Sequence, residues 1–351
     1  PGETEEVKNS DEGFINKMYG HIKAVKYSLS DLTVPLTGAE FTIYVDVNGN
    51  GTYEKNVDTI YGVMLEDENR VHSIKNLPKG DYLMKETKPP KYHTVDENYY
   101  PVKIDVPGET EEVKNCDEGF ANDFYGNLKV VKYSKSDLTI PLPGALYSVY
   151  KDVNKNGTYE ADVDTFVGNL KETLGVHTMN DVMSGMYLVK EIKAPKNHTI
   201  DENYYSVEIK TPGETVEVKN CNEGFANDFL GHIILEKYSE LTTEKTLEGA
   251  EFTVYVDVNK NGTYEADVDT FYGIMDEDKG VHTKTNLLSG MYLVKETKAP
   301  ANHKLDKNYY SVTIDVPGEV IEVKNSDEGF VNCLEERPFV FTKTDCVTDE
   351  A

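Results

Sequence analysis

Residues 25–54 read VKYSLSDLTVPLTGAEFTIYVDVNGNGTYE, and this stretch decides the architecture because it occurs three times. It returns as VKYSKSDLTIPLPGALYSVYKDVNKNGTYE at 131–160 and as EKYSELTTEKTLEGAEFTVYVDVNKNGTYE at 236–265. The copies start 106 and 105 residues apart, which is the length of a small domain rather than of one solenoid turn. We therefore expect three tandem domains.

Both ends of the chain match parts of the same unit. PGETEEVKNSDEGFIN at 1–16 resembles the end of a unit, and FVFTKTDCVTDEA at 339–351 resembles the start of one. We therefore interpret the chain as a piece of a longer secreted protein. The predicted division is a preceding fragment at 1–16, repeats 1, 2 and 3 at 17–123, 124–228 and 229–333, and a following fragment at 334–351.

Within each unit the residue pattern favours strands. Alternating runs such as AEFTIYVD (39–46) and DYLMKET (81–87) are separated by Gly, Pro and Asn-Gly turns. About seven short strands in roughly a hundred residues predict an all-β, immunoglobulin-like sandwich. The repeats join without a Pro/Ser-rich linker, so we expect the sandwiches to abut in an elongated array.

Composition limits the partners. The 351 residues carry a net charge of −27, and so acidic a surface repels phosphate backbones and anionic lipid. We therefore expect no nucleic acid partner, and no membrane insertion because no apolar run is long enough to span a bilayer. Cys116 and Cys221 hold the same position in two repeats, one domain apart, so we expect four free thiols rather than a disulfide framework, with a Cys333–Cys346 pair as the alternative.

Strand alternation places three polar side chains per repeat on apolar faces. In repeat 1, Glu86 follows Tyr82 at a spacing of four, and Lys26 and Asn122 each lie two residues after an apolar side chain. The corresponding residues are Lys132, Glu191 and Asn227 in repeat 2, and Lys237, Glu296 and Asn332 in repeat 3. Lys23 is excluded as a shared functional group because its counterpart in repeat 3 is Ile234.

Two interpretations fit these inward polar groups. A buried charge costs several kcal/mol unless it is paired, so the Lys, Glu and Asn can form a purely structural network. Alternatively, burial lowers the pKa of the Lys and raises that of the Glu. A neutral amine can then attack the Asn carbonyl while the Glu shuttles the proton, which releases ammonia and leaves an amide cross-link.

The spacing suits a cross-link between the two ends of a domain. Lys lies 60 or 59 residues before Glu and 96 or 95 residues before Asn in every repeat. A closed loop of roughly 100 residues is worth on the order of 4–5 kcal/mol in the chain-entropy treatment of disulfides. Asn16 and Lys343 lack partners of their own unit, so we expect neither to be cross-linked within this chain.

Two elements carry a family resemblance. GAEFTVY…GMYLVKETKAP and FANDFYGNLKVVKYS are similar to the B-type repeat domains of Gram-positive collagen adhesins (CnaB-like) and to SpaA-type pilin domains. The resemblance implies a prealbumin-like, reverse immunoglobulin sandwich with an autocatalytic Lys–Asn isopeptide bond assisted by a Glu. It assigns the Lys to Lys26, Lys132 and Lys237, the Glu to Glu86, Glu191 and Glu296, and the Asn to Asn122, Asn227 and Asn332.

This sequence differs from the family pattern in the Asp that follows the Lys, and it contains a second Asn that could serve as the acyl donor. The Asp that usually follows the family's Lys is displaced to Asp31 and Asp137, and repeat 3 has Glu240. A second Asn occurs in the motif EVKN of each repeat, at Asn115, Asn220 and Asn325, and competes for the role of acyl donor.

A polar hairpin in each repeat is a candidate calcium loop. DVNGNGTYEKNVD (46–58) begins like an EF-hand loop, but its twelfth position is Val57. Candidate ligands are Asp46, Asn48 and Asn50, with Asp152, Asn154 and Asn156, and Asp257, Asn259 and Asn261, at the equivalent positions. The alternative is a hairpin whose Asn-Gly pair supplies only the turn.

The remaining residues indicate no reaction on an external substrate. No phosphate loop, nucleophile elbow or zinc spacing occurs, and His72, His177 and His282 are predicted to lie at strand edges. We expect a structural stalk on the extracellular, cell-wall-anchored surface of a Gram-positive bacterium, partnered by neighbouring repeats and requiring no cofactor, with Ca²⁺ as an optional stiffener. The alternative is a repeated binding module for a host protein or glycan.

Overall fold

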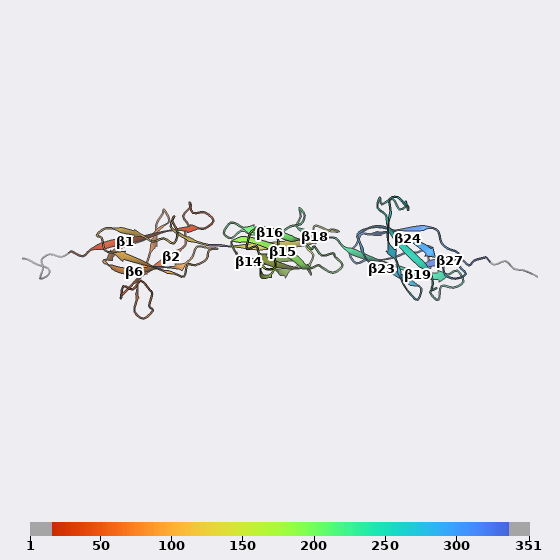
Figure 1. Ribbon diagram of the computed structural model, residues 1–351, viewed down its shortest axis with the longest axis horizontal. Coiled ribbons are helices and arrows are strands. Elements are labelled where there is room, and N and C mark those ends of the chain that lie inside the picture. Colours follow the sequence, from red (N-terminus) through yellow and green to blue (C-terminus); the bar gives the residue numbers. More distant parts are fainter. Residues whose placement is uncertain (1–15, 337–351) are drawn as a thin grey trace, which may run out of the picture. The chain divides into compact units, whose positions relative to one another are not determined.

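The computed structural model describes residues 16–336, and within them each repeat is built from two β-sheets without a helix. Figure 1 shows the strands of repeats 1, 2 and 3 in red to orange, green, and cyan to blue. Repeat 1 comprises β1 (Tyr19–Ser28), β2 (Glu40–Val45), β3 (Thr59–Val63), β4 (Leu65–Glu66), β5 (Val71–Pro78), β6 (Gly80–Lys88), β7 (Tyr99–Ile104), β8 (Thr110–Glu112) and β9 (Phe120–Asn122).

Repeats 2 and 3 have the same nine strands in the same order. Repeat 2 comprises β10 (Tyr125–Ser134), β11 (Leu146–Lys151), β12 (Thr165–Asn169), β13 (Lys171–Thr173), β14 (Val176–Met183), β15 (Gly185–Lys193), β16 (Tyr204–Ile209), β17 (Thr215–Glu217) and β18 (Phe225–Asn227). Repeat 3 comprises β19 (Leu230–Ser239), β20 (Glu251–Val256), β21 (Thr270–Ile274), β22 (Asp276–Asp278), β23 (Val281–Leu288), β24 (Gly290–Lys298), β25 (Tyr309–Ile314), β26 (Val320–Glu322) and β27 (Phe330–Asn332).

The predicted all-β sandwich is confirmed, with more strands than the seven expected. One sheet of repeat 1 has the order β4-β5-β1-β8, with β9 also paired to β1, and the other has the order β3-β2-β6-β7. Three of the nine strands, β4, β8 and β9, are only two or three residues long. Runs that short give only a weak periodicity signal, which makes a count of strands from the sequence imprecise.

The first strand organises each repeat. β1 pairs antiparallel with β5, and parallel with β8 along His21–Lys23 and with β9 along Lys26–Ser28. The last strand of the repeat therefore lies beside its first strand. This arrangement brings the segment that contains Asn122 next to the one that contains Lys26.

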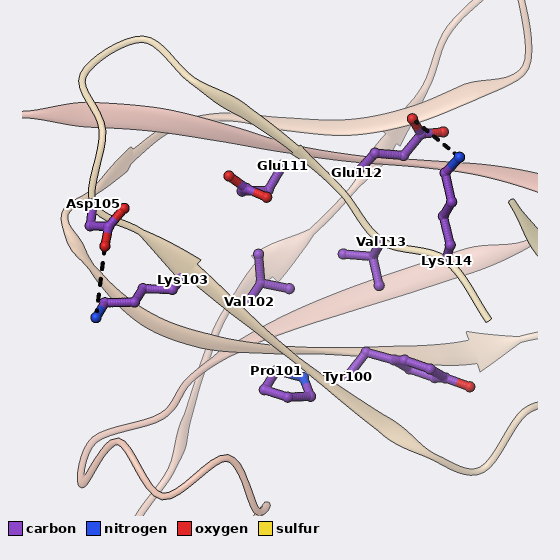
Figure 2. Close-up of a pocket in the computed structure, with 9 residues that line it drawn as sticks. All are labelled: Tyr100, Pro101, Val102, Lys103, Asp105, Glu111, Glu112, Val113 and Lys114. Carbon is purple, nitrogen blue, oxygen red and sulfur yellow. Dashed lines mark ion pairs between the residues drawn. The ribbon is translucent and has the colours of Figure 1, made fainter. Parts of the chain in front are cut away.

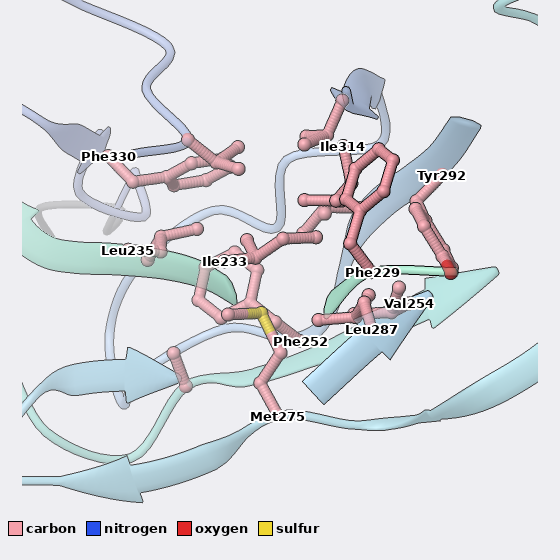
Figure 3. Close-up of a cluster of buried hydrophobic side chains, with 14 residues drawn as sticks. Phe229, Ile233, Leu235, Phe252, Val254, Met275, Leu287, Tyr292, Ile314 and Phe330 are labelled. Atoms are coloured by element: carbon pink, nitrogen blue, oxygen red, sulfur yellow. The ribbon is translucent and has the colours of Figure 1, made fainter. Parts of the chain in front are cut away.

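The core lies between the two sheets. In repeat 1 it is built from buried residues such as Ile22 of β1, Phe41 of β2, Leu77 of β5 and Met84 of β6. Figure 3 shows the equivalent cluster of repeat 3, in which Phe252, Leu287 and Phe330 point toward one another. Alternation is strict in β1, where every second residue from Gly20 to Ser28 is buried.

A tyrosine stack fastens the Asp/Asn hairpin of each repeat to the sheet. Tyr53 of the hairpin lies parallel to Tyr99 of β7, with ring centroids 4.4 Å apart, and Lys85 Nζ lies 4.9 Å from the centroid of Tyr99. The same stacks join Tyr159 to Tyr204 at 4.6 Å and Tyr264 to Tyr309 at 4.5 Å. The hairpin is thus held by aromatic packing in every copy.

The prediction that His72, His177 and His282 lie at strand edges is wrong, because all three side chains are buried. His72 lies on β5, an internal strand, opposite Ala24 of β1. Its Nε2 lies 3.1 Å from the carbonyl oxygen of Ala39, and its ring meets Phe41 edge-on. Burial lowers the pKa of His72, so the ring is neutral and packs as a core side chain.

The described part of the chain was also compared with the expectations for membrane insertion and for the cysteines. Residues 16–336 contain no helix with the length and apolarity needed to cross a bilayer. Cys116, Cys221 and Cys333 are free thiols. Cys346 and Lys343, and most of the predicted end fragments 1–16 and 334–351, lie outside the described residues.

A glycine near the start of the first strand permits a close approach of the two sheets. A Cβ atom on Gly20 would lie 2.7 Å from Ile104 Cγ2 and 3.2 Å from the carbonyl oxygen of Glu109. In the same way, a Cβ atom on Gly126 would lie 2.7 Å from Ile209 Cγ2, and one on Gly231 would lie 2.6 Å from Ile314 Cγ2. The backbone carbonyl limits how far the surroundings can relax.

Gly20→Ala should therefore destabilise repeat 1 by overpacking, by about 1–3 kcal/mol. Gly80→Ala is the matched control, because its Cβ would have its nearest neighbour at an ordinary 3.7 Å. Urea unfolding of both variants and the parent, followed by circular dichroism, measures the difference. Equal unfolding midpoints for Gly20→Ala and Gly80→Ala would contradict this account of the close approach.

Candidate functional site: a buried Lys–Glu–Asn cluster

The three inward polar groups of each repeat converge in the core, and β1 supplies the first. Lys26 is fully buried on the same face of β1 as Ile22 and Ala24. Its Nζ donates hydrogen bonds to the carbonyl oxygens of Tyr27 and Phe120, each at 3.2 Å. Two backbone carbonyls therefore orient the amine from either side.

The carboxyl group comes from β6 in the opposite sheet. Glu86 is fully buried, and its Oε1 lies 3.8 Å from Lys26 Nζ. Oε1 accepts no hydrogen bond from any residue that the structure describes. Oε2 accepts one from the backbone N–H of Asp96 at 2.8 Å. One carboxyl oxygen is thus fixed by the backbone, and the other faces the amine.

The amide comes from β9, beside β1. Asn122 is buried, and its Nδ2 donates hydrogen bonds to Glu86 Oε2 and to the carbonyl oxygen of Thr94. Lys26 and Asn122 therefore contact the same carboxyl group from opposite sides. The structure brings together all three residues that the sequence singled out in repeat 1.

Repeat 2 reproduces the whole cluster, and repeat 3 reproduces the contact between its Glu and its Asn. Lys132 Nζ lies 3.9 Å from Glu191 Oε1, and Asn227 Nδ2 donates to Glu191 Oε2 at 2.5 Å. In repeat 3, Asn332 Nδ2 contacts both oxygens of Glu296, at 2.7 and 2.8 Å. The amide oxygen of Asn332 is buried and has no hydrogen-bond donor among the described residues.

Burial shifts both ionisable groups toward their neutral forms. Desolvation lowers the pKa of Lys26 from 10.5 to about 8, against the attraction of Glu86. The pKa values of Lys132 and Lys237 fall to about 8 for the same reason. Desolvation raises the pKa values of Glu86, Glu191 and Glu296, although hydrogen bonds to each carboxylate oppose the rise. An amine of lowered pKa is a nucleophile, and a carboxyl of raised pKa is an acid.

The rival asparagines have a different set of partners. Asn115 holds the backbone of Ala121 from both sides: its Nδ2 donates to the carbonyl oxygen at 2.8 Å, and its Oδ1 accepts from the N–H at 2.7 Å. Asn220 and Asn325 hold Ala226 and Val331 in the same way. These asparagines fix the short last strand, and their amides are already saturated.

Sequence reasoning missed Asp96, which lies in the loop before β7. Its backbone N–H holds Glu86, while its side chain accepts hydrogen bonds from Tyr100 Oη at 2.6 Å and Asn115 Nδ2 at 3.0 Å. Its negative charge also favours the charged form of Lys26. The sequence feature that could have identified Asp96 is the motif Asp-x-Asn-Tyr-Tyr, which recurs at 96–100, 201–205 and 306–310. In contrast, Asp31 is exposed and caps a turn at Thr33.

The candidate calcium loops form an internal hydrogen-bond network. Asp46 accepts hydrogen bonds from the backbone N–H groups of Gly49, Asn50 and Gly51, and the amides of Asn48 and Asn50 donate to Glu54. Within residues 16–336, no group of three or more His, Cys, Asp or Glu side chains is placed to hold a metal ion. Calcium binding by this loop and its copies stays a prediction.

Repeat 1 also has a surface groove between β7 and residues 111–114 (Figure 2). Its volume is about 430 Å³. Two ion pairs line it, Lys103 with Asp105 at 3.7 Å and Lys114 with Glu112 at 3.9 Å, and Glu111 adds a further acidic group. The buried cluster remains the candidate for chemistry.

Comparison with known proteins places this geometry in a family. The SpaA prealbumin-like fold domain matches residues 20–118, 126–223 and 231–328. A collagen adhesin of Staphylococcus aureus is 24% identical over 210 residues, which is 56% of this chain but 17% of that protein. The chain thus spans less than a fifth of the length of this curated relative.

Solved structures of pilins also match at low identity. The major pilin subunit BcpA of Bacillus cereus is 16% identical, with 90% of this chain and 100% of that chain covered and a TM-score of 0.45. The full-length major pilin SpaD of Corynebacterium diphtheriae is 17% identical, with 92% and 98% covered and a TM-score of 0.33. The family match covers most of the chain and confirms the resemblance predicted from the sequence. The chain therefore belongs to the SpaA prealbumin-like fold domain family, of which it contains three consecutive copies.

Proposed function

We propose that each repeat locks itself with an amide bond between its buried Lys and Asn, and that the locked repeats form a structural stalk. The observation that carries this proposal is the carboxyl group of Glu86, which contacts Lys26 Nζ at 3.8 Å and also the amide of Asn122. Each cross-link joins the first strand of a repeat to its last. The reaction occurs once per repeat, so the chain is not an enzyme that acts on an external substrate.

The reaction is balanced without a cofactor. The neutral Nζ of Lys26 attacks Cγ of Asn122, and the new Nζ–Cγ bond replaces the Cγ–Nδ2 bond. Protonated Glu86 first gives its proton to the amide, and the resulting carboxylate then accepts a proton from the attacking Lys26 nitrogen, so that Nδ2 leaves as ammonia. Glu86 ends in its starting state. Its hydrogen bond to Nδ2 suits the delivery of that proton to the leaving group.

Energetics favour a reaction over a permanent ion pair. A fully buried Lys and Glu lose hydration worth several kcal/mol per ion, and this pair is separated by 3.8 Å rather than joined by close hydrogen bonds. Transfer of the proton from Lys to Glu gives two neutral groups and removes much of that cost. The neutral pair is also the reactive form, so the burial that disfavours the charges also favours the reaction.

The stalk assignment rests on the family and on the relatives. The collagen adhesin and the pilins that match are surface proteins of Gram-positive bacteria by name. We infer the same extracellular surface location here, with neighbouring repeats as the immediate partners. Tandem β-sandwich repeats suit a spacer that holds a distal region away from the cell wall. Anchoring to the wall belongs to the proposal.

Intact mass tests the cross-link. The parent should be lighter than its sequence by three molecules of ammonia, and each of Glu86→Gln, Glu191→Gln and Glu296→Gln should restore one, because glutamine cannot shuttle the proton. Glu40→Gln, at an exposed position, is the control and should leave all three losses in place. A parent with its full sequence mass would leave the cluster as a structural network only.

Alkaline pH provides a second test, in a variant whose amines stay free. Burial lowers the pKa of each Lys in the folded parent to about 8 from 10.5, and the variant Asn122→Ala/Asn227→Ala/Asn332→Ala should keep this lowered pKa because the burial remains. Between these values the unfolded state binds more protons, so the free energy of unfolding should rise with pH, by up to about 3 kcal/mol per repeat. The parent, whose amines are consumed, should lack this rise. Urea unfolding at pH 8 and pH 10 measures it, and parallel pH profiles would contradict the prediction.

Single-molecule stretching tests the stalk itself. The parent should show no unfolding steps from its three repeats, because tension crosses from Lys to Asn through a covalent bond. The triple Glu→Gln variant should release about 95 residues per repeat, or about 300 Å of chain at each step. Three full-length unfolding steps in the parent would rule out a covalently locked stalk, even if its stability were high.

A further inference from the structure

Each repeat has one sheet edge that is apolar and exposed. β3 ends the sheet order β3-β2-β6-β7 and pairs with β2 alone in that sheet, so one side of its backbone faces outward. Ile60 on this strand is 68% exposed, and Val63 is 51% exposed. These side chains contribute little to the core of their own repeat. An exposed apolar edge strand is a template for pairing with another chain.

The exposed apolar side chains recur at the same position in all three repeats, and in repeat 3 Lys284 Nζ also donates a hydrogen bond to the carbonyl oxygen of Ile274 on β21, at 2.7 Å. Phe166 on β12 and Phe271 on β21 replace Ile60 and are 60% and 65% exposed. The next residues, Tyr61, Val167 and Tyr272, are also exposed, and none of the three strands contains a charged residue. Single exposed apolar residues are ordinary, but a large one kept on an edge strand in three copies indicates a contact surface.

The opposite edge of the same sheet is protected. β7 carries Pro101 and Lys103, and the neighbouring groove is lined by Glu111, Glu112 and Lys114 (Figure 2). Proline and charges are the usual means of preventing strand pairing at an edge. The chain therefore blocks one edge of the sheet in repeat 1 and leaves the other open.

Charge identifies the chemistry of the partner. In repeat 3, Asp267 precedes β21, and Asp276, Glu277 and Asp278 follow it, all exposed. These last three line a groove of about 410 Å³ beside the edge. The equivalent groove of repeat 1 has a volume of about 450 Å³ and contains Leu65, Glu66 and Asp67 together with Lys75. Two copies of a chain with net charge −27 repel each other, so the complement is a cationic strand.

We propose that the edge strands β3, β12 and β21 bind an extended cationic segment of a partner protein by strand addition. The added strand continues the sheet through main-chain hydrogen bonds and covers Ile60, Phe166 or Phe271 with its own apolar side chains. Lys or Arg at the ends of that segment meet the acidic residues that flank β3 and β21, whereas β12 is followed by Lys171 and Glu172. Three edges on one chain allow a multivalent partner to bind with increased avidity.

A designed peptide tests this surface on the full chain. The probe is a fluorescently labelled nine-residue peptide of alternating threonine and valine with two lysines at each end. Fluorescence anisotropy should detect its binding, and hydrogen exchange should show new protection of residues 59–63, 165–169 and 270–274. Two control peptides, one with glutamates for the lysines and one with a central proline, should not bind.

Matched variants separate the apolar edge from simple charge attraction. Ile60→Lys/Phe166→Lys/Phe271→Lys should weaken binding of the cationic peptide by about tenfold or more. Val106→Lys/Thr211→Lys/Val316→Lys makes the same charge change at exposed loop positions and should weaken it much less. Circular dichroism checks that both variants fold.

Several results would overturn the proposal. They are failure of the cationic peptide to bind, equal binding of the proline peptide, and equal losses in the two lysine variants. A concentration-dependent dimer of the parent that is abolished by the edge substitutions would instead assign the edge to a second copy of this chain. None of these outcomes depends on the Lys–Asn bond, so the stalk proposal stands or falls separately.

Discussion

The burial of one lysine beside one carboxyl group is the constraint on which each repeat depends. Lys26 and Glu86 are fully enclosed, and enclosure favours their neutral forms more strongly than any single contact does. The apolar residues around them, among them Phe41 and Phe120, are thus more than core filling. They create the low-polarity environment that makes the amine nucleophilic and the carboxyl acidic.

The topology explains why these groups come from three different strands. β1 and β9 are parallel neighbours, so the first and last strands of a repeat run side by side, and β6 faces them from the other sheet. The carboxyl group therefore lies across the sandwich from both the amine of Lys26 and the amide of Asn122. The backbone N–H of Asp96 holds the carboxyl group of Glu86, and the side chain of Asn115 holds the backbone of Ala121, next to Asn122. Precise placement of this kind is what enforced proximity requires.

Sequence patterns predicted the parts of the site that lie on long strands. Alternation in β1 and β6 put Lys26 and Glu86 on inward faces, and both are buried. Alternation could not reveal that the side chain of His72 is buried. A histidine occurs in strand sequences at both buried and exposed positions, and here the deciding contact is with the carbonyl oxygen of Ala39, which is distant in the sequence. Alternation also missed Asp96, because the contact with Glu86 is made by the backbone N–H of Asp96 in a loop. It missed the open edge at Ile60 as well, because the order of strands in the sheet, rather than the residue type, determines the exposure of that position.

The proposed cross-link would secure one of the shortest strands of the repeat. β9 is three residues long and pairs with β1 over Lys26–Ser28 only, so its hydrogen bonds alone offer little resistance to tension. A chain under load enters at Tyr19, follows β1 to Lys26, and leaves through Asn122. With an amide bond between those two side chains, residues 27–121 lie outside the load path. The rest of the sandwich is then free to keep features that a force-bearing sheet could not tolerate, including an open edge strand.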